Sequence, residues 1–133
     1  MMGSQDDLDQ NCLFCRWIRA GNAVETHGTV AAFDDGFPVT KGHLLIVPMR
    51  HTDNGFSMTE QEIRDCEALI RILSDKISKS DLTVSGFNIG MNIGESAGQT
   101  VFHAHIHLIP RRDRDCDNPK GGVRGVIDGK RCY

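Results

Sequence analysis

Long apolar runs and an excess of positive charge are both absent from this chain of 133 residues. No stretch approaches the roughly 20 apolar residues of a membrane-spanning helix, so the sequence argues against a membrane partner. Fifteen Lys and Arg against 18 Asp and Glu leave a net charge of −3. That balance argues against a nucleic-acid partner, which would need a basic face. With 39 % hydrophobic residues, the composition suits one compact domain.

The first ten residues, MMGSQDDLDQ, also lack the basic and apolar regions of a secretory signal peptide. The stretch is polar and acidic, and we expect residues 1–10 to form a flexible segment and residues 11–133 to form a single domain. Five cysteines are an odd number in a chain without a secretion signal, which favours reduced thiols and the cytoplasm. No internal repeat or low-complexity stretch interrupts the chain.

Two helices are predicted from the spacing of apolar residues. Phe14, Trp17 and Ile18 share one face of a short helix that ends at Gly21. A long helix begins at a capping box, in which a Thr is followed three residues later by a Glu, at residues 59–62. Its predicted apolar face consists of Ile63, Cys66, Leu69, Ile70, Leu73 and Ile77.

Apolar segments bounded by glycine, proline and acidic residues predict the strands. They cover residues 28–35, Leu44–Val47, 86–94 and 100–110. From about residue 111 the chain is rich in Gly, Arg and Asp, and we expect an irregular tail with one short strand at Val123–Ile127. This order of elements favours an α+β fold with a mostly antiparallel sheet.

Three of the six histidines, His103, His105 and His107, alternate with apolar residues in the segment QTVFHAHIHLIP. Alternate side chains of a strand face the same way, so the three imidazoles are expected to share one face. A solvated polar face is one interpretation. The absence of any other polar residue type in the row favours a function, either as metal ligands or as a nucleophile with supporting donors.

The segment NIGESAGQT, residues 92–100, precedes this row and has a composition suited to anion binding. Glycines such as Gly94 and Gly98 let backbone N–H groups approach a ligand closely. Asn92, Gln99 and Thr100 add uncharged donors without much bulk. Beside a cluster of imidazoles, these features favour a phosphate group as the ligand.

Cys12 and Cys15 form a Cys-x-x-Cys pair with three possible explanations. The pair could be half of a zinc site, a redox pair, or two small buried residues. The βαβ context of a thioredoxin-like redox pair is absent. Since the chain has no second Cys-x-x-Cys, a zinc site would have to be completed by histidines.

The segment HAHIHLI resembles the signature of the histidine triad (HIT) family, in which three histidines alternate with apolar residues. DDGFPVTKGHLLIVPMRH, GFNIGMNIGESAGQTVFHAHIHLIPR and NPKGGVRGV are similar to successive landmarks of that family over roughly residues 12–127. The resemblance is to bacterial-type Hint and diadenosine polyphosphate hydrolase-like members. It implies an α+β homodimer, with the sheet continued across the two-fold axis and the long helix at the interface.

The resemblance also implies an enzyme, a nucleotidyl hydrolase acting at the α-phosphate of nucleoside phosphoramidates or dinucleoside polyphosphates. His105 would attack phosphorus and form a covalent nucleotidyl-histidine, from which water releases a nucleoside monophosphate. A transferase is disfavoured because Ala104 replaces the proline of a His-Pro-His sequence. The alternatives are a nucleotide-binding regulatory scaffold with residual hydrolysis, and a zinc module that uses all three histidines.

Residue roles follow from the same resemblance, with Asp35 at the ribose, His43 near the phosphate, and Trp17 and Phe33 beside an expected adenine. The implied catalytic residues are His103, His105, His107 and Gln99. The implied nucleotide-binding residues are Asp35, His43, Asn92, Gln99, Thr100, His105 and His107.

A zinc-containing subset of the family implies a structural Cys2His2 zinc site and no organic cofactor. The implied ligands are Cys12, Cys15, His51 and His103. A zinc-bound His103 could not also donate to phosphate, so the two roles assigned to this residue compete.

Overall fold

The computed structural model of this chain describes residues 8–132 and shows the expected α+β architecture. Neighbouring strands of its five-stranded sheet are all antiparallel, in the order β1-β2-β3-β5-β4. The elements are α1 (Leu13–Ala20), β1 (Glu25–His27), β2 (Val30–Asp34), β3 (Leu44–Pro48), η2 (Gly55–Ser57), α2 (Glu60–Ser80), β4 (Val84–Gly90), η3 (Glu95–Ala97), β5 (Ile106–Arg112) and η4 (Gly122–Val126).

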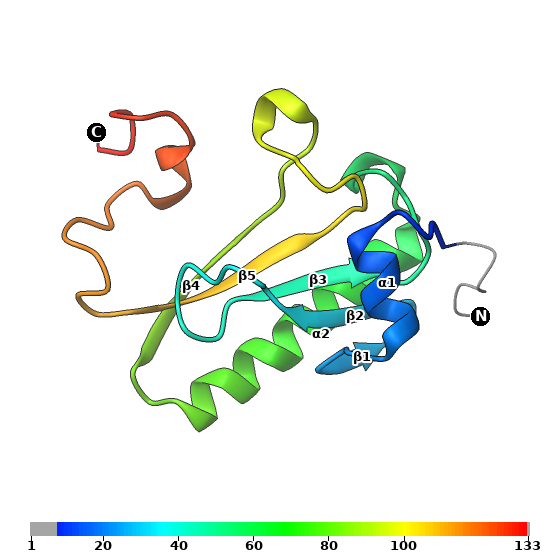
Figure 1. Cartoon of the computed structure of the whole chain (residues 1–133). Helices are drawn as coiled ribbons and strands as arrows, with labels where there is room; N and C mark the ends of the chain where they lie inside the picture. The colour runs from blue at the N-terminus through cyan, green and yellow to red at the C-terminus, as the bar shows by residue number, and fades with distance from the viewer. Residues whose placement is uncertain (1–7, 133) are drawn as a thin grey trace.

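The two helices cover opposite faces of the sheet (Figure 1). One core cluster joins α2 to the inward side chains of β2, β3 and β5, including the fully buried Leu69 and Leu108. The other joins α1 to the opposite side chains of β2 and β3, including Phe14 and Phe33. Alternate side chains of β2 and β3 therefore pack into the two core clusters on opposite faces of the sheet, which is why both strands are largely apolar.

Local signals explain where the helices begin and end. Gly21 ends α1 with a φ of 70°, a left-handed conformation that favours glycine. The predicted capping box is present at the start of α2, where the Thr59 hydroxyl accepts from the Glu62 N–H and Glu62 accepts from the Thr59 N–H. The buried Glu62 carboxylate also binds Arg50 through two N–H donors, at 2.9 and 3.1 Å. This pair attaches the chain after β3 to α2.

Ile63, a member of the predicted apolar face of α2, has a side chain that is 51 % exposed. It lies in the first turn of the helix. There it faces a hollow shared with Ile89 and Ile106 rather than the sheet. Leu69 and Leu73, further along the same face, are buried as predicted.

Several strand boundaries differ from the prediction. β1 was missed because three residues are too short to show alternation. β4 starts and ends earlier than residues 86–94, and β5 begins only at Ile106. Pro110, expected to end that strand, lies inside it. β3 pairs with residues 106–108 of β5 only, so the missing N–H of Pro110 falls beyond the start of β3.

The ends of the chain also depart from expectation. Residues 1–7 of the predicted flexible segment lie outside the described residues, whereas Leu8 packs against the α1 core. The short strand expected at Val123–Ile127 is wrong, because η4 forms there instead. Its backbone turns at Gly121, with a φ of 86°, which starts a tight helix rather than an extended strand.

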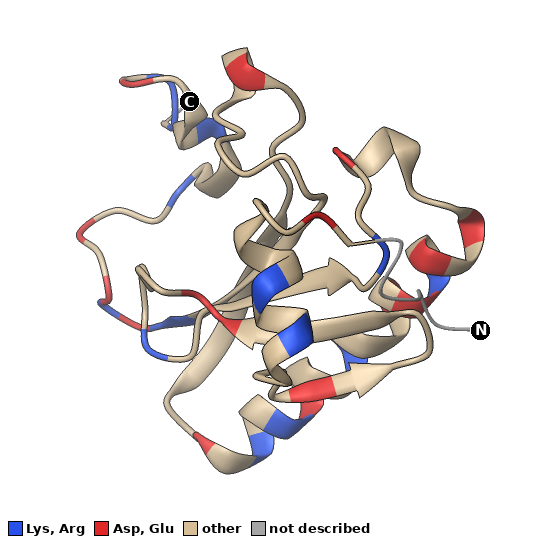
Figure 2. Cartoon of the chain, turned by 45° about the vertical axis from the view of Figure 1, so that its right-hand side comes forward, with Lys and Arg blue, Asp and Glu red and all other residues tan. Residues whose placement is uncertain are grey.

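Charged residues of both signs are interspersed over the chain (Figure 2). This pattern agrees with the small net charge and presents no basic stripe among residues 8–132. In the same part of the chain, no helix is both long and apolar enough to cross a membrane.

Shortening Leu69 should cost substantial stability because its side chain is fully buried between α2 and the sheet. We expect Leu69→Ala to lower the free energy of unfolding by about 2–5 kcal/mol. Urea unfolding at one fixed protein concentration measures this loss. Leu82→Ala is the matched control, since Leu82 is 90 % exposed, and it should change stability by less than about 0.5 kcal/mol. Equal losses in both variants would contradict the assigned core.

Candidate functional site

The structure divides the histidine row between two sites. His103 and His105 precede β5, and only His107 lies within it. The expectation that all three project from one regular strand face is therefore wrong. The Ala104 N–H donates to the Thr52 carbonyl at 2.8 Å, so this segment is held by the loop after β3 instead of a strand ladder. His103 joins the cysteine pair, while His105 and His107 line a pocket.

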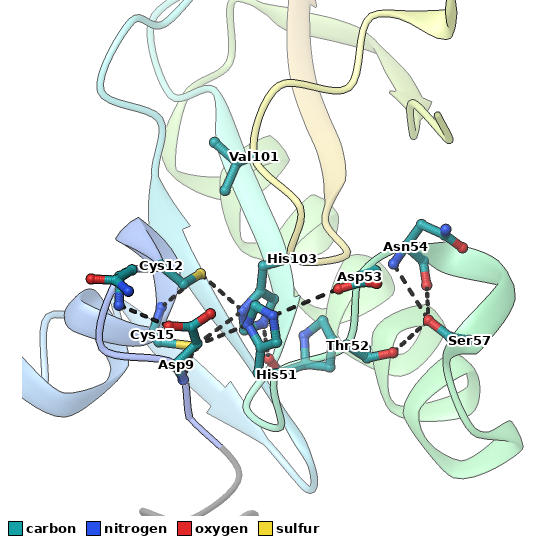
Figure 3. Close-up of polar contacts among 12 residues, drawn as sticks. Asp9, Cys12, Cys15, His51, Thr52, Asp53, Asn54, Ser57, Val101 and His103 are labelled. Carbon is teal, nitrogen blue, oxygen red and sulfur yellow. Dashed lines mark hydrogen bonds and ion pairs between the residues drawn. The ribbon is translucent and has the colours of Figure 1, made fainter. Parts of the chain in front are cut away.

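The first site is a compact cluster of Cys12, Cys15, His51 and His103 (Figure 3). One ligand atom from each residue lies within 4.8 Å of all the others. Nδ1 of His103 is 3.4 Å from both sulfurs, and Nδ1 of His51 is 3.3 Å from the Cys15 sulfur. Zinc bonds of about 2.3 Å to sulfur and 2.0–2.1 Å to nitrogen give tetrahedral N···S separations of about 3.6 Å. The observed spacing is close to that arrangement.

His103 is oriented by its second ring nitrogen. Nε2 lies 2.7 Å from the Pro48 carbonyl oxygen, which can only accept. Nε2 therefore carries the proton, and the Nδ1 lone pair faces the sulfurs. Burial lowers the pKa of this fully buried imidazole to about 4, so it is neutral at pH 7. A carbonyl that fixes the ring of a histidine is a common support for a metal ligand.

Backbone contacts also support the cysteines. Cys12 is the N-cap of α1, and its sulfur accepts from the Cys15 N–H at 3.5 Å. The Asp9 N–H donates to the Cys15 sulfur at 3.3 Å. Burial raises the pKa of the Cys15 thiol to about 11, so the isolated thiol stays protonated at neutral pH.

The second site is a pocket of about 300 Å³ on the face of the sheet that carries α1. Its lining combines apolar side chains, three of them from α1, with two histidines and a carboxylate. The lining residues are Leu13, Phe14, Trp17, Asp35, Gly36, Phe37, Leu45, Asn92, Gly98, Thr100, Val101, His105 and His107.

His105 has one ring nitrogen engaged and one available. Its Nδ1 lies 2.8 Å from the His103 carbonyl oxygen, so Nδ1 holds the proton and Nε2 carries the lone pair. Phe14 packs edge-on against the ring, with centroids 4.9 Å apart. Burial lowers the pKa of His105, which keeps the imidazole neutral. A neutral imidazole held in this way can act as a nucleophile.

Asp35, His43 and His107 form a second polar cluster at the edge of the pocket. Nε2 of His43 is 2.9 Å from Nδ1 of His107. The Asp35 carboxylate is 3.3 Å from the same Nε2 and 3.9 Å from the same Nδ1. Burial lowers the pKa of both histidines, although the Asp35 charge opposes that shift.

Other predicted site residues are split between the pocket and its supports. Asn92 and Thr100 line the pocket. Gln99 is buried beneath the loop, where its amide donates to the carbonyls of Asp53 and Val101 and accepts from the Gly94 N–H. Both amide hydrogens are therefore used by the backbone, and this side chain has no donor left for a phosphate.

The predicted aromatic residues have different roles. Trp17 lines the pocket, whereas Phe33 lies buried with its ring centroid 5.6 Å from that of Trp17. Sequence reasoning missed Leu13 and Phe14 as pocket residues. Their positions four and three residues before Trp17 place them on the same side of a helix, so the helical spacing contained a usable signal.

The chain is similar to known proteins of one family. The HIT domain family matches residues 20–114 of the chain. An uncharacterized HIT-like protein of Saccharolobus solfataricus is 38 % identical over 115 residues, covering 84 % of this chain and 82 % of that protein. A Zn-bound histidine triad family protein from Mycobacterium smegmatis has a similar solved structure, with a TM-score of 0.72, 30 % identity and coverage of 78 % of this chain and 77 % of that one.

Two further relatives have names that state an activity. Adenylylsulfatase HINT3 of Arabidopsis thaliana is 33 % identical over 113 residues, which cover 82 % of this chain and 56 % of that protein. The asymmetrical bis(5′-nucleosyl)-tetraphosphatase of Schizosaccharomyces pombe is 38 % identical over 85 residues, covering 64 % of this chain and 46 % of that protein. The extent of the family match and the identity to its members show that the chain belongs to the HIT family.

Proposed function

We propose that the chain is a nucleotidyl hydrolase that cleaves nucleoside phosphoramidates or dinucleoside polyphosphates at the α-phosphate. The observation that carries this proposal is the orientation of His105, whose Nδ1–H donates to a backbone carbonyl and whose Nε2 lone pair is available at the pocket. A neutral nucleophile needs no strong base at pH 7. The relatives named as an adenylylsulfatase and a dinucleoside tetraphosphatase support nucleotides as the substrate class.

The reaction has two displacements at phosphorus. Nε2 of His105 attacks the α-phosphorus, a P–N bond forms, and the bond to the amine or phosphate leaving group breaks, an amine taking a proton from the solvent or from an N–H group in the pocket. Water then attacks the same phosphorus and gives up a proton to the solvent, the P–N bond breaks with its electron pair returning to Nε2, and a nucleoside monophosphate is released. Such transfers depend mainly on positioning and on stabilising negative charge, which Asn92, Thr100 and His107 can support from the pocket wall.

The apolar part of the pocket suits a nucleobase, for which we propose adenine. Trp17, Phe14 and Leu45 offer flat and apolar surfaces there. We place Asp35 at the ribose, because a carboxylate can accept from two adjacent hydroxyls. One of its oxygens already accepts from the Phe37 N–H at 2.7 Å, which orients the carboxylate at the pocket edge.

We also propose a structural zinc ion held by Cys12, Cys15, His51 and His103. The four donors fit because they converge within 4.8 Å, and the His103 lone pair faces inward. Backbone N–H groups that donate to both sulfurs suit thiolates, which the buried site disfavours without a cation. Zinc in a four-ligand site of this kind supplies folding energy and charge neutralisation rather than an open coordination position. His103 thus supports catalysis only indirectly.

We propose that the protein is a homodimer. A hollow of about 660 Å³ between α2 and strands β4 and β5 is lined by Ile63, Ile70, Ile89 and Ile106 together with Cys66 and three polar residues of α2, Glu67, Arg71 and Ser74. β4 is an edge strand in the sheet order, so a second sheet could extend from it.

The five cysteines are free thiols, which suits a reducing compartment such as the cytoplasm.

Removal of the nucleophile should abolish turnover and leave binding nearly intact. We expect His105→Ala to lower adenosine phosphoramidate hydrolysis by about 10³-fold or more, because no other group can form the P–N bond. AMP affinity, measured through the fluorescence of Trp17, should change little. His27→Ala, in β1 and away from the pocket, is the matched control. Activity within about tenfold of wild type would exclude His105 as the nucleophile. AMP binding by a wild-type protein that never turns over would favour the scaffold function.

Loss of one sulfur should weaken metal binding without touching the pocket wall directly. We expect Cys12→Ser to lower both the zinc content of the purified protein and its melting temperature, because three ligands hold zinc less tightly than four. Metal analysis by mass spectrometry and thermal unfolding measure the two effects. Cys132→Ser is the control, since Cys132 is exposed in the tail. Wild-type protein that contains no zinc, after purification without chelators, would contradict the site.

A charge in the α2 hollow should prevent dimer formation. We expect Ile70→Arg to shift the sedimenting species from dimer to monomer, since a bulky charged guanidinium would have to lose water among the isoleucines of the hollow. Leu82→Arg places the same charge on an exposed site and should leave the dimer unchanged. Monomeric wild-type protein at micromolar concentration would contradict the proposed assembly.

A further inference from the structure

His43 has one ring nitrogen whose state is set by the backbone. The Val39 N–H donates to Nδ1 of His43 at 3.1 Å, so Nδ1 must carry a lone pair. A neutral imidazole holds one proton, which therefore sits on Nε2. Burial lowers the pKa of His43, in agreement with this neutral form. Val39 thus determines the tautomer of His43 through a main-chain contact.

The state of His43 then determines that of His107. Nε2–H of His43 lies 2.9 Å from Nδ1 of His107, and two N–H groups cannot face each other at that distance. Nδ1 of His107 is therefore an acceptor, and the proton of this ring is on Nε2. Because His107 lines the pocket, its N–H is a hydrogen-bond donor available there.

Without His43, the nearest charged group would favour the opposite tautomer. The Asp35 carboxylate is 3.9 Å from Nδ1 of His107 and can only accept. In the absence of another donor, the carboxylate would draw the proton to Nδ1 and leave Nε2 as a lone pair. Nε2 of His43 lies nearer to Nδ1 of His107 than the carboxylate does, and it presents a donor there. His43 therefore favours the proton on Nε2 of His107, whereas the carboxylate alone would favour it on Nδ1.

We propose that His43 is a positioning residue that keeps His107 in the Nε2–H tautomer, opposite to the tautomer of His105. His105 then presents a lone pair and His107 a proton to the same pocket. Given the proposed hydrolase function, which this step assumes, the lone pair attacks phosphorus and the Nε2–H stabilises a phosphate oxygen or the departing group. His43 acts through His107 and does not itself need to touch the substrate.

Asp35, His43 and His107 also have the spacing of a possible metal site, because their ligand atoms lie within 4.8 Å of one another. Metal binding would require lone pairs on Nε2 of His43 and on Nδ1 of His107. The proton of His43 would then move to Nδ1, directly opposite the Val39 N–H. The geometry therefore points to a hydrogen-bond chain from Val39 through His43 to His107. A hydrogen-bond chain and a bound metal would give different ¹⁵N NMR spectra of the two histidines.

The test is the tautomeric state of His107, measured by ¹⁵N NMR of histidine-labelled, zinc-loaded protein without nucleotide. Difference spectra with His107→Ala assign its signals, and a pH of about 8 keeps unperturbed imidazoles neutral. We expect the Nε2–H form in wild type. We also expect it in His43→Gln, whose side-chain amide can donate to Nδ1. In His43→Leu, which has no donor, the Nδ1–H form should become the major one.

Turnover should follow the tautomer. We expect His43→Leu to lower kcat by about 10²-fold, with KM changed less than about threefold, whereas His43→Gln keeps most of the activity. A purely structural role would predict equal losses in both variants. Wild-type His107 in the Nδ1–H form, unchanged tautomers in His43→Leu, or metal-shifted signals at His43 and His107 would each overturn the proposal. If the tautomers behave as expected and wild type does not hydrolyse the phosphoramidate, the proposed function fails and the positioning role stands.

Discussion

The hydrogen bond from Nε2–H of His103 to the Pro48 carbonyl is the contact on which both sites depend. It joins the last residue of β3 to a segment that is not itself part of the sheet. One consequence is that Nδ1 of His103 faces the two sulfurs at the start of α1. Another is that the His103 carbonyl is held in place to accept from His105. A single buried residue therefore connects the cysteine cluster to the His105 imidazole.

The same connection explains why α1 can form a wall of the pocket. This helix has only eight residues, too few to be stable alone. Its first turn is anchored through Cys12 and Cys15, and Phe14 packs edge-on against both His103 and His105. A metal ion at the cluster would strengthen this anchor without approaching the substrate. The apolar part of the pocket and the His105 ring would then be positioned together.

Much of the fold was predictable because its signals are local, as the Thr59 capping box and Gly21 show. Residue types also indicated candidate metal ligands and a candidate nucleophile, and the structure brings those side chains together in two places. The hydrogen-bond partners of these side chains could not be predicted, because most of the partners are backbone atoms. Residue types do not reveal that His103 contacts the Pro48 carbonyl, that His43 accepts from the Val39 N–H, or that backbone carbonyls hold Gln99. β5 begins at Ile106 although β3 continues beyond its partner Ile46 to Pro48, because the Ala104 N–H donates to the Thr52 carbonyl in the loop after β3.

Alternation in the histidine row therefore predicts less than it first suggests. It correctly indicates that His105 and His107 reach one pocket, but identical side chains two residues apart have no built-in difference in chemistry. The difference comes from the atom opposite Nδ1, which is a carbonyl oxygen for His105 and a donating imidazole for His107. An acceptor at that place leaves a lone pair on Nε2, and a donor leaves a proton there. Two residues of one type thus obtain opposite roles because their environments supply opposite hydrogen-bond partners.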